Sequence, residues 1–252
     1  MSQDLSGRTV VVAGSTSAAG VAVVRTLSQA GARVAAVDIL EDRVQELAAA
    51  YNNVTGYACN LADLQAVEGL QASVQNDLGP VDGLIHLVGG WRGGTGIAGQ
   101  TDEDWDFLHT SVLTTLRNTS RVFYDDLAAS PAGRLAIVSA ESASSPTAGG
   151  AAYAAVKSAA EAWTLAVAEG FRRLQGGNES TRSAQHSAAL VLVVKALVDD
   201  RMRAAQPERK FPGYTDVSVL ADAVQRIFDL EAELINGQRL PLTAGQFAGL
   251  PA

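Results

Sequence analysis

Short runs of apolar residues recur along the chain, and longer stretches with helical spacing lie between them. A continuous apolar run bounded by turn residues is typical of a strand buried on both faces, whereas apolar residues every three to four positions indicate an amphipathic helix. The runs begin at Thr9 (TVVVA), Arg33 (RVAAVD), Val54 (VTGYA), Gly83 (GLIHLV), Arg134 (RLAIVS), Ala188 (AALVLVV) and Gln238 (QRLPL). Each run predicts a buried strand.

The stretches between these strands predict helices. After the first strand VAVVRTLSQAG has helical spacing, and further helices are expected over residues 63–78, 102–127, 151–169 and 216–230. Consecutive strands joined by a helix run parallel, because a parallel connection must be long enough to hold one. The alternation predicts an α/β fold, a single-domain Rossmann-type doubly wound parallel sheet of about seven strands with helices on both faces.

The strand pattern gives no clear domain boundary. A chain of 252 residues suits one large buried core, so residues 1–252 are expected to form a single domain. Residues 204–214 interrupt the alternation and contain Pro207 and Pro212. Irregular segments of this kind often cover ligands, and the region of about 200–215 is therefore a candidate substrate lid.

Composition narrows the class of partner. The net charge is -8 at pH 7, which disfavours nucleic acid or an anionic membrane and favours a small-molecule substrate. The single cysteine, Cys59, allows no internal disulfide, and neither a signal-peptide core near Met1–Arg8 nor a run of about 18 apolar residues is present. A cytoplasmic protein is expected. The three histidines are scattered, so no metal site is expected.

A glycine-containing turn, GSTSAAG from Gly14 to Gly20, joins the first strand to the first helix. Backbone N–H groups and the positive helix end meet at such a turn and suit a pyrophosphate, although an ordinary tight turn is the alternative. Asp38 ends the second strand, where a carboxylate can accept hydrogen bonds from ribose hydroxyls and would repel a 2′-phosphate. NAD(H) is therefore favoured over NADP(H), with a simple helix cap as the alternative role of Asp38.

Tyr153 and Lys157 stand one helical turn apart, directly after a strand and the Gly149-Gly150 loop. Spacing of i to i+4 places both on one helix face. A nearby cation stabilises a phenolate, so Tyr153 can exchange a proton with a carbonyl oxygen, an alcohol or an imine nitrogen. A solvated helix face is the alternative, but doubly wound folds bind ligands at this end of the strands.

These residues, in this order, resemble the short-chain dehydrogenase/reductase family over nearly the whole chain. AGSTSAAG looks like its TGxxxGxG turn, YAAVK like its YxxxK, and INGQRLPLTAG (235–245) like its closing strand. The resemblance implies a homodimer or homotetramer formed through the long helix (102–127) and the tyrosine helix. It also implies a set of cofactor-binding residues, namely Gly14, Ser15, Thr16, Ser17, Ala19, Gly20, Asp38, Asn60, Leu61, Val88, Gly89, Gly90, Tyr153 and Lys157.

The chain departs from the family pattern at several positions. Ala18 replaces the middle glycine, HLVG (86–89) replaces NNAG, and Val112, with Ser111 beside it, replaces the asparagine of the proton relay. The serine expected thirteen residues before the tyrosine is Ala140. Ser142 is the better substitute, because Ser139 is expected on the opposite face of the strand.

Dihydropteridine reductases, one branch of the family, also carry alanine there, and their GGWxGG pattern resembles residues 89–94. Trp91, Ala140 and Ser142 are therefore candidate substrate residues, with Trp91 either stacking on a flat ring or plugging its loop. Arg92 either meets a substrate carboxylate or is solvated.

Three functions remain open. The leading hypothesis is an NAD(H)-dependent oxidoreductase that transfers hydride to or from a carbonyl, alcohol or imine-like substrate, with Tyr153, Lys157 and Ser142 as catalytic residues. A dihydropteridine-reductase-like enzyme is its sharpest form. Ala140 and Val112 instead favour a nucleotide-binding homologue without catalysis, and a scaffold without cofactor would leave Asp38 unexplained.

Overall fold

Seven parallel strands form the central sheet of the computed structural model, which describes residues 4–176, 185–243 and 246–247. Their spatial order is β3-β2-β1-β4-β5-β6-β9, and a short β10 (Gln246–Phe247) pairs antiparallel with β9 at the edge. The parallel strands are β1 (Thr9–Ala13), β2 (Arg33–Asp38), β3 (Val54–Ala58), β4 (Gly83–His86), β5 (Arg134–Ala140), β6 (Ala188–Val194) and β9 (Arg239–Thr243). The predicted α/β fold class is confirmed, with β10 as an addition.

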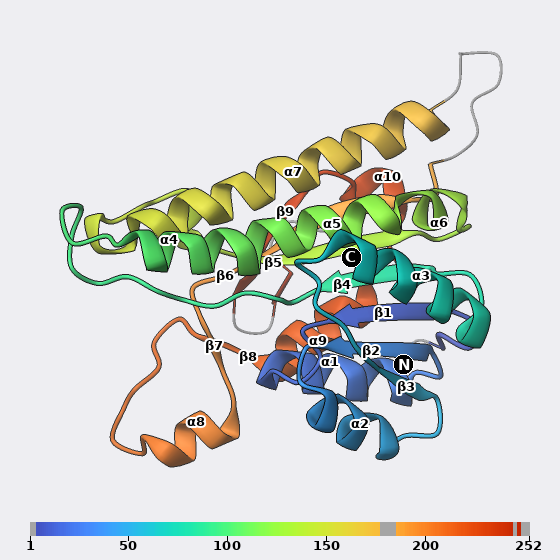
Figure 1. Cartoon of the computed structure of the whole chain (residues 1–252), viewed down its shortest axis with the longest axis horizontal. Helices are drawn as coiled ribbons and strands as arrows, with labels where there is room; N and C mark the ends of the chain where they lie inside the picture. The colour runs from blue at the N-terminus through green and yellow to red at the C-terminus, as the bar shows by residue number, and fades with distance from the viewer. Residues whose placement is uncertain (1–3, 177–184, 244–245, 248–252) are drawn as a thin grey trace.

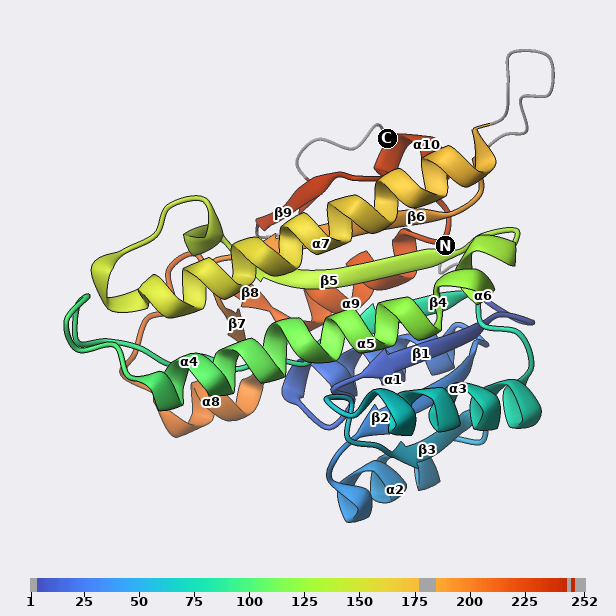
Figure 2. The ribbon, with the colours of Figure 1, turned by 45° about the horizontal axis from the view of Figure 1, so that its top comes forward.

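Helices cover both faces of the sheet (Figure 1). One face carries α1 (Ala18–Gln29), α2 (Glu41–Ala49) and α9 (Val217–Arg226). The other carries α3 (Leu64–Leu78), the helical segments from residue 102 to residue 129, and α7 (Ala151–Gln175), as Figure 2 shows. The short α10 (Ala232–Ile235) precedes β9. Because both faces are covered, every residue of β1 and β6 is buried, which explains their unbroken apolar runs.

The helix expected over residues 102–127 is interrupted. It divides into α4 (Asp102–Leu108), a π-helical segment (His109–Thr114), α5 (Thr115–Val122) and α6 (Tyr124–Ala129). The Ser111 hydroxyl donates to the Phe107 carbonyl at 2.7 Å and the Thr115 hydroxyl to the Ser111 carbonyl at 2.8 Å, so side chains bind backbone carbonyls through the widened turn. Side-chain bonds of this kind are not visible in the apolar spacing.

The tyrosine helix extends beyond its expected end at residue 169, because α7 continues to Gln175. The Gln175 amide donates to the Ala128 carbonyl at 3.0 Å and to the Ser187 hydroxyl at 2.7 Å. These bonds join the end of α7 to α6 and to the start of β6, and they satisfy a buried polar side chain that the apolar pattern does not predict.

The candidate lid has secondary structure of its own. It contains β7 (Leu197–Val198), α8 (Asp200–Ala205) and β8 (Thr215–Asp216), and β7 pairs with β8 in a separate two-stranded parallel sheet. Figure 1 shows α8 standing away from the main body, at the same end as α4. Arg203 on α8 forms an ion pair with Asp216, which ties the two ends of the segment together.

Candidate functional site

A cleft of about 980 Å³ opens at the carboxyl ends of β4, β5 and β6. Helix α7 supplies Tyr153 and Lys157 to its wall, and the segment after β6 supplies the opposite side. The lining residues are Ala19, Leu87, Val88, Gly89, Gly90, Trp91, Val138, Ser139, Ala140, Ser142, Tyr153, Lys157, Val194, Lys195, Ala196, Leu197, Met202, Arg209 and Tyr214. The structure thus brings every candidate catalytic and substrate residue to one cleft, together with four other candidate cofactor residues, Ala19, Val88, Gly89 and Gly90.

The remaining candidate cofactor residues lie beside this cleft, at the ends of neighbouring strands. Gly14 has a φ of +82°, a left-handed conformation that favours glycine, and its N–H donates to the Val37 carbonyl of β2 at 2.9 Å. A Cβ on Gly20 would stand 2.3 Å from the Gly14 carbonyl oxygen, so only glycine lets α1 pack this closely on the turn. The turn brings the start of α1 directly to the end of β1.

The turn offers polar groups that a dinucleotide phosphate would satisfy. Ser17 caps α1 by accepting from the Gly20 N–H at 3.0 Å, whereas the N–H groups of Ala18 and Ala19 in the first turn have no intrahelical acceptor. The Ser15 hydroxyl is fully buried and has no hydrogen-bond partner among the described residues. These groups fit an anionic ligand, and Ala18 itself is exposed.

Asp38 stands at the end of β2, next to that turn. Its Oδ2 accepts from the Thr16 N–H at 3.1 Å and from the Thr16 hydroxyl at 2.8 Å. Asp38 therefore caps the glycine turn, a contact that its position in the sequence did not reveal, and Oδ1 accepts only a longer bond of 3.3 Å from the Leu40 N–H.

Asn60 and Leu61 follow β3 and do not reach the cleft. The Asn60 side chain accepts from the Ala62 N–H at 3.1 Å, and Leu61 is buried. Asn118, on α5, holds this loop through bonds of 3.1 and 3.0 Å to the Leu61 and Ala62 carbonyls.

Tyr153 and Lys157 lie on the buried face of α7. Burial raises the pKa of the Tyr153 phenol, so the phenol is protonated at neutral pH. Lys157 Nζ stands 5.8 Å from the centre of the Tyr153 ring and donates to the Val138 carbonyl of β5 at 2.8 Å. The shift in the pKa of Tyr153 is thus opposite in direction to the lowering expected from Lys157, and its cause is desolvation.

The Lys157 ammonium is itself perturbed. Burial lowers its pKa to about 8, and the negative charge of Glu161 partly opposes this shift. Glu161 lies one turn further along α7 and pairs with Arg239 of β9 at 3.0 Å, while its Oε1 is buried without a partner among the described residues. Sequence reasoning missed Glu161, although i to i+4 spacing from Lys157 is a signal that could have found it.

Three residues lie at or next to the position where the family pattern has a serine. Ala140 lies in the cleft wall and is buried, while Ser142 follows it at the wall and is partly exposed. Ser139 also contributes to the wall, but its hydroxyl is buried and unpartnered within the described part of the chain. Ser142 is thus the hydroxyl best placed to meet a ligand.

The position of the relay asparagine is apolar. Val112 Cγ2 stands 3.6 Å from where a Cβ on Gly89 would lie, so Val112 packs against the cleft wall. Ser111 does not replace it, because its hydroxyl bonds to the Phe107 carbonyl of its own helix.

His86 links β4 to α5. Its Nε2 lies 3.1 Å from the Thr115 hydroxyl and its Nδ1 lies 3.2 Å from the Thr119 hydroxyl. Both threonine hydroxyls also donate to backbone carbonyls of their own helical segment, and which ring nitrogen of His86 donates depends on its tautomer. Burial, aided by the charge of Lys157, lowers the pKa of His86 to about 3. His86 is therefore a neutral side chain that connects strand β4 to helix α5 through hydrogen bonds.

Trp91 lines the cleft and is 66% exposed, so it does not plug its loop. Arg92 has a partly exposed side chain and does not line the cleft. It pairs with Asp104 at 3.1 Å and lies over the Phe107 ring at 4.2 Å. The indole Nε1 of Trp163 donates to the Ser120 hydroxyl at 2.8 Å, which joins α7 to α5.

The chain beyond β6 adds lining residues that sequence reasoning did not single out as site residues. They are Lys195, Ala196, Leu197, Met202, Arg209 and Tyr214, of which the last three fall in the candidate lid. The available signal was Lys195, a charged residue placed immediately after seven consecutive apolar residues.

Within the described ranges, no group of three or more His, Cys, Asp and Glu residues is arranged to hold a metal ion. No helix in the described part of the chain combines the length and apolarity needed to cross a membrane.

Comparisons with known proteins bear on the family and the fold of this chain. A 2,3-dihydro-2,3-dihydroxybenzoate dehydrogenase of Bacillus subtilis (strain 168) is 30% identical over 164 residues, 64% of this chain and 62% of that protein. A putative D-mannonate oxidoreductase from Haemophilus influenza, solved with bound NAD, has a TM-score of 0.82 at 16% identity, with 96% of each chain covered.

A short chain oxidoreductase from Pseudomonas aeruginosa PAO1, solved with NADPH and described as containing an atypical catalytic center, also has a TM-score of 0.82, at 18% identity over 98% of this chain and 100% of that one. Both structures share the fold. The family model of the short chain dehydrogenases matches residues 8–174, which confirms the resemblance drawn from the motifs. The chain therefore belongs to the short-chain dehydrogenase family.

Proposed function

We propose that the protein is an NAD(H)-dependent oxidoreductase that reduces a small carbonyl or imine-like substrate, with Tyr153 as proton donor. The observation that carries the proposal is the position of Tyr153 and Lys157 on the wall of one cleft, next to the glycine turn at the start of α1. Family membership and structural neighbours solved with NAD or NADPH support a nicotinamide cofactor.

A bound nicotinamide would supply the hydride that goes to the substrate carbon. Tyr153 then donates its phenolic proton to the substrate oxygen or nitrogen, and the resulting phenolate is reprotonated from solvent. Burial raises the pKa of Tyr153, so at neutral pH the phenol carries the proton that this direction needs. Lys157 contributes a positive charge near the phenolate as it forms, with its ammonium held by the Val138 carbonyl.

The glycine turn and Asp38 are proposed to hold the adenosine half of the cofactor. The N–H groups at the start of α1 and the Ser15 hydroxyl meet the phosphates, and Asp38 meets the ribose hydroxyls. A 2′-phosphate in the same place would stand against the Asp38 carboxylate, so NADH is the preferred cofactor.

At the substrate end, Ser142 is proposed to assist Tyr153, and Trp91 to stack on a flat substrate. Alanine at position 140 removes the hydroxyl that would anchor a carbonyl oxygen, which favours an imine-like substrate of the dihydropteridine type. The segment of about 200–215 is proposed as the lid, because Met202, Arg209 and Tyr214 contribute to the cleft wall.

A second candidate function is nucleotide binding without catalysis. Two observations favour it. Ala140 in the cleft wall and Val112, which packs against that wall, are apolar at positions where polar side chains would assist proton transfer. Catalysis is favoured instead by Tyr153 and Lys157 and by the Ser142 hydroxyl, which has no hydrogen-bond partner within the described residues.

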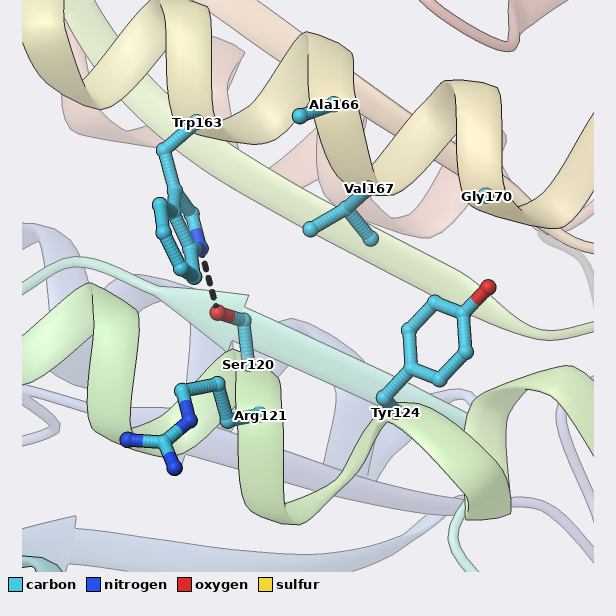
Figure 3. Close-up of a pocket in the computed structure, with 7 residues that line it drawn as sticks. All are labelled: Ser120, Arg121, Tyr124, Trp163, Ala166, Val167 and Gly170. Atoms are coloured by element: carbon cyan, nitrogen blue, oxygen red, sulfur yellow. Dashed lines mark hydrogen bonds between the residues drawn. The ribbon is translucent and has the colours of Figure 1, made fainter.

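Self-association is proposed through the face formed by α5, α6 and α7. A second hollow of about 400 Å³ opens on this face, where the Trp163–Ser120 bond lies at one end and Tyr124 at the other (Figure 3). Its walls are largely apolar, and whether two or four copies assemble stays open.

Cofactor preference tests the proposal. The binding of each cofactor is followed by the change in its own nicotinamide fluorescence as protein is titrated in. We expect NADH to bind about tenfold more tightly than NADPH, which corresponds to a difference in binding free energy of about 1.4 kcal/mol. Asp38→Asn removes the charge and should narrow this difference, whereas Asp42→Asn, an exposed change on α2, should not. Absence of binding by both cofactors would contradict both nucleotide functions, and an unchanged preference in Asp38→Asn would remove Asp38 from its proposed role.

A further inference from the structure

The wall of the cleft carries positive charge without negative charge. Its lining includes Lys157, Lys195 and Arg209, and none of its lining residues is an aspartate or glutamate. The chain as a whole has a net charge of -8, with 27 acidic and 19 basic residues. A cleft that concentrates cations in an acidic protein attracts anions by its local potential.

Two other arginines near this cleft are matched by carboxylates. Arg92 pairs with Asp104, and Arg203 on α8 pairs with Asp216. Lys195 and Arg209, which we call the cationic pair, form no ion pair within the described residues. Their hydrogen bonds go to neutral acceptors instead. Lys195 Nζ donates to the Pro212 carbonyl at 3.0 Å.

Arg209 is held in place while part of its guanidinium stays free. It donates to the Gln206 side chain at 2.8 Å and to the Tyr214 hydroxyl at 2.9 Å, and its guanidinium lies 5.1 Å from the centre of the Phe211 ring. A guanidinium has five N–H donors and an ammonium three, so both members of the cationic pair keep donors for another acceptor. An arginine fixed by neutral neighbours suits a carboxylate or phosphate, which it can bind through two parallel bonds.

The phosphates of the cofactor are not the natural partner of Lys195. Lys195 follows β6, whereas the glycine turn follows β1, and β5 and β4 lie between these two strands. With neighbouring strands about 4.8 Å apart, the two strand ends are separated by roughly 14 Å. Lys195 thus lies at the substrate end of the cleft, and Arg209 lines the same cleft together with Trp91, Met202 and Tyr214.

We propose that the substrate carries an anionic group, a carboxylate or a phosphate, on a small planar ring, and that Lys195 and Arg209 bind this group. The inference rests on the proposed function for the reacting end of the substrate. The ring faces Trp91 and Tyr214, the anionic group meets the cationic pair near the mouth, and the reacting carbon points to Tyr153.

The test titrates benzoate, phenyl phosphate and neutral benzamide into the protein alone and into the protein saturated with NADH, by calorimetry. We expect at least one of the anions to bind about tenfold more tightly than benzamide and to weaken as salt is added. The preferred anion distinguishes a carboxylate substrate from a phosphate substrate. Equal affinity for benzamide, or no binding of either anion, would overturn the inference.

Three variants locate the binding. Lys195→Gln and Arg209→Gln should each weaken anion binding severalfold and leave NADH affinity unchanged. Lys210→Gln, an exposed charge next to Arg209 that does not line the cleft, should change neither. Weaker NADH binding in the first two variants, with anion binding unchanged, would overturn the inference and assign the cationic pair to the cofactor. If wild-type protein does not bind NADH, the proposed function is contradicted instead. The titration of the anions without NADH distinguishes that failure from a failure of the anion-binding inference.

Discussion

Tyr153→Phe is expected to lower kcat by about 10²–10⁴ on any substrate that the protein reduces, because general acid catalysis contributes about this factor. The variant removes one oxygen and keeps the ring that packs beside Lys157. Phenylalanine has no hydroxyl, so the side chain at position 153 can no longer donate a proton. NADH affinity should stay within about twofold of wild type, since the phenol is proposed to act on the substrate. The measurement is steady-state NADH oxidation together with a binding titration.

Tyr124→Phe is the matched control. Tyr124 lies in the hollow between α6 and α7, where its ring stacks on Phe171 at 5.0 Å, and it does not line the cleft. Its activity should equal that of wild type. Unchanged turnover in Tyr153→Phe would remove Tyr153 from its proposed role, and a loss of equal size in both variants would indicate a structural effect.

Stability is expected to fall steeply in acid because of His86. The unfolded chain protonates this residue near pH 6.5, whereas in the fold its pKa is about 3. Between these values the unfolded state binds one proton more than the folded state, so the free energy of unfolding decreases as pH falls, by about 1.4 kcal/mol per pH unit. From pH 7 to pH 4 this group alone should cost about 3 kcal/mol. Urea unfolding at a series of pH values measures the slope.

Two comparisons isolate the contribution of His86. His86→Asn has no titrating group at this position and should show a shallower slope, while His109→Asn, at an exposed histidine, should keep the slope of wild type. If His86→Asn does not fold, the ring can be titrated in wild type by nuclear magnetic resonance. A His86 ring that protonates near pH 6.5 in the folded protein would contradict the buried, neutral role.

Much of the fold is predictable from the sequence because the sheet is covered on both faces. Each apolar run from Thr9 to Leu242 became a parallel strand, since strands buried on both sides carry no polar alternation. The interruption of the long helix was not predictable from spacing. It depends on hydroxyl bonds made by Ser111 and Thr115, which apolar periodicity does not encode.

The candidate site, like the fold, was predictable from the sequence only in part. The motifs located the glycine turn, Tyr153 and Lys157, because phosphate binding and proton transfer need particular residue types at fixed spacing. Contacts between distant segments were not predictable. The Thr16–Asp38 bonds and the Glu161–Arg239 pair join residues whose proximity only the folded sheet creates.

Lys195 and Arg209 were missed for a further reason. Lys195 follows a predicted strand, and Arg209 lies in a segment that the sequence predicted only as irregular. A charged residue in either place is usually solvated. Only the folded arrangement shows that both line the same cleft and that neither is matched by a carboxylate in the described ranges.

The central claim is that this cleft transfers hydride from NADH. The most direct test follows NADH oxidation, at the nicotinamide absorbance, against quinonoid dihydropterin, cyclic imines, quinones and simple ketones, each with and without a ring carboxylate. Turnover of at least one of these is predicted, with the imine-like members favoured by Ala140 and the carboxylate-bearing members favoured by Lys195 and Arg209. A protein that binds NADH and oxidises it with none of them would contradict catalysis and support a nucleotide-binding protein without activity.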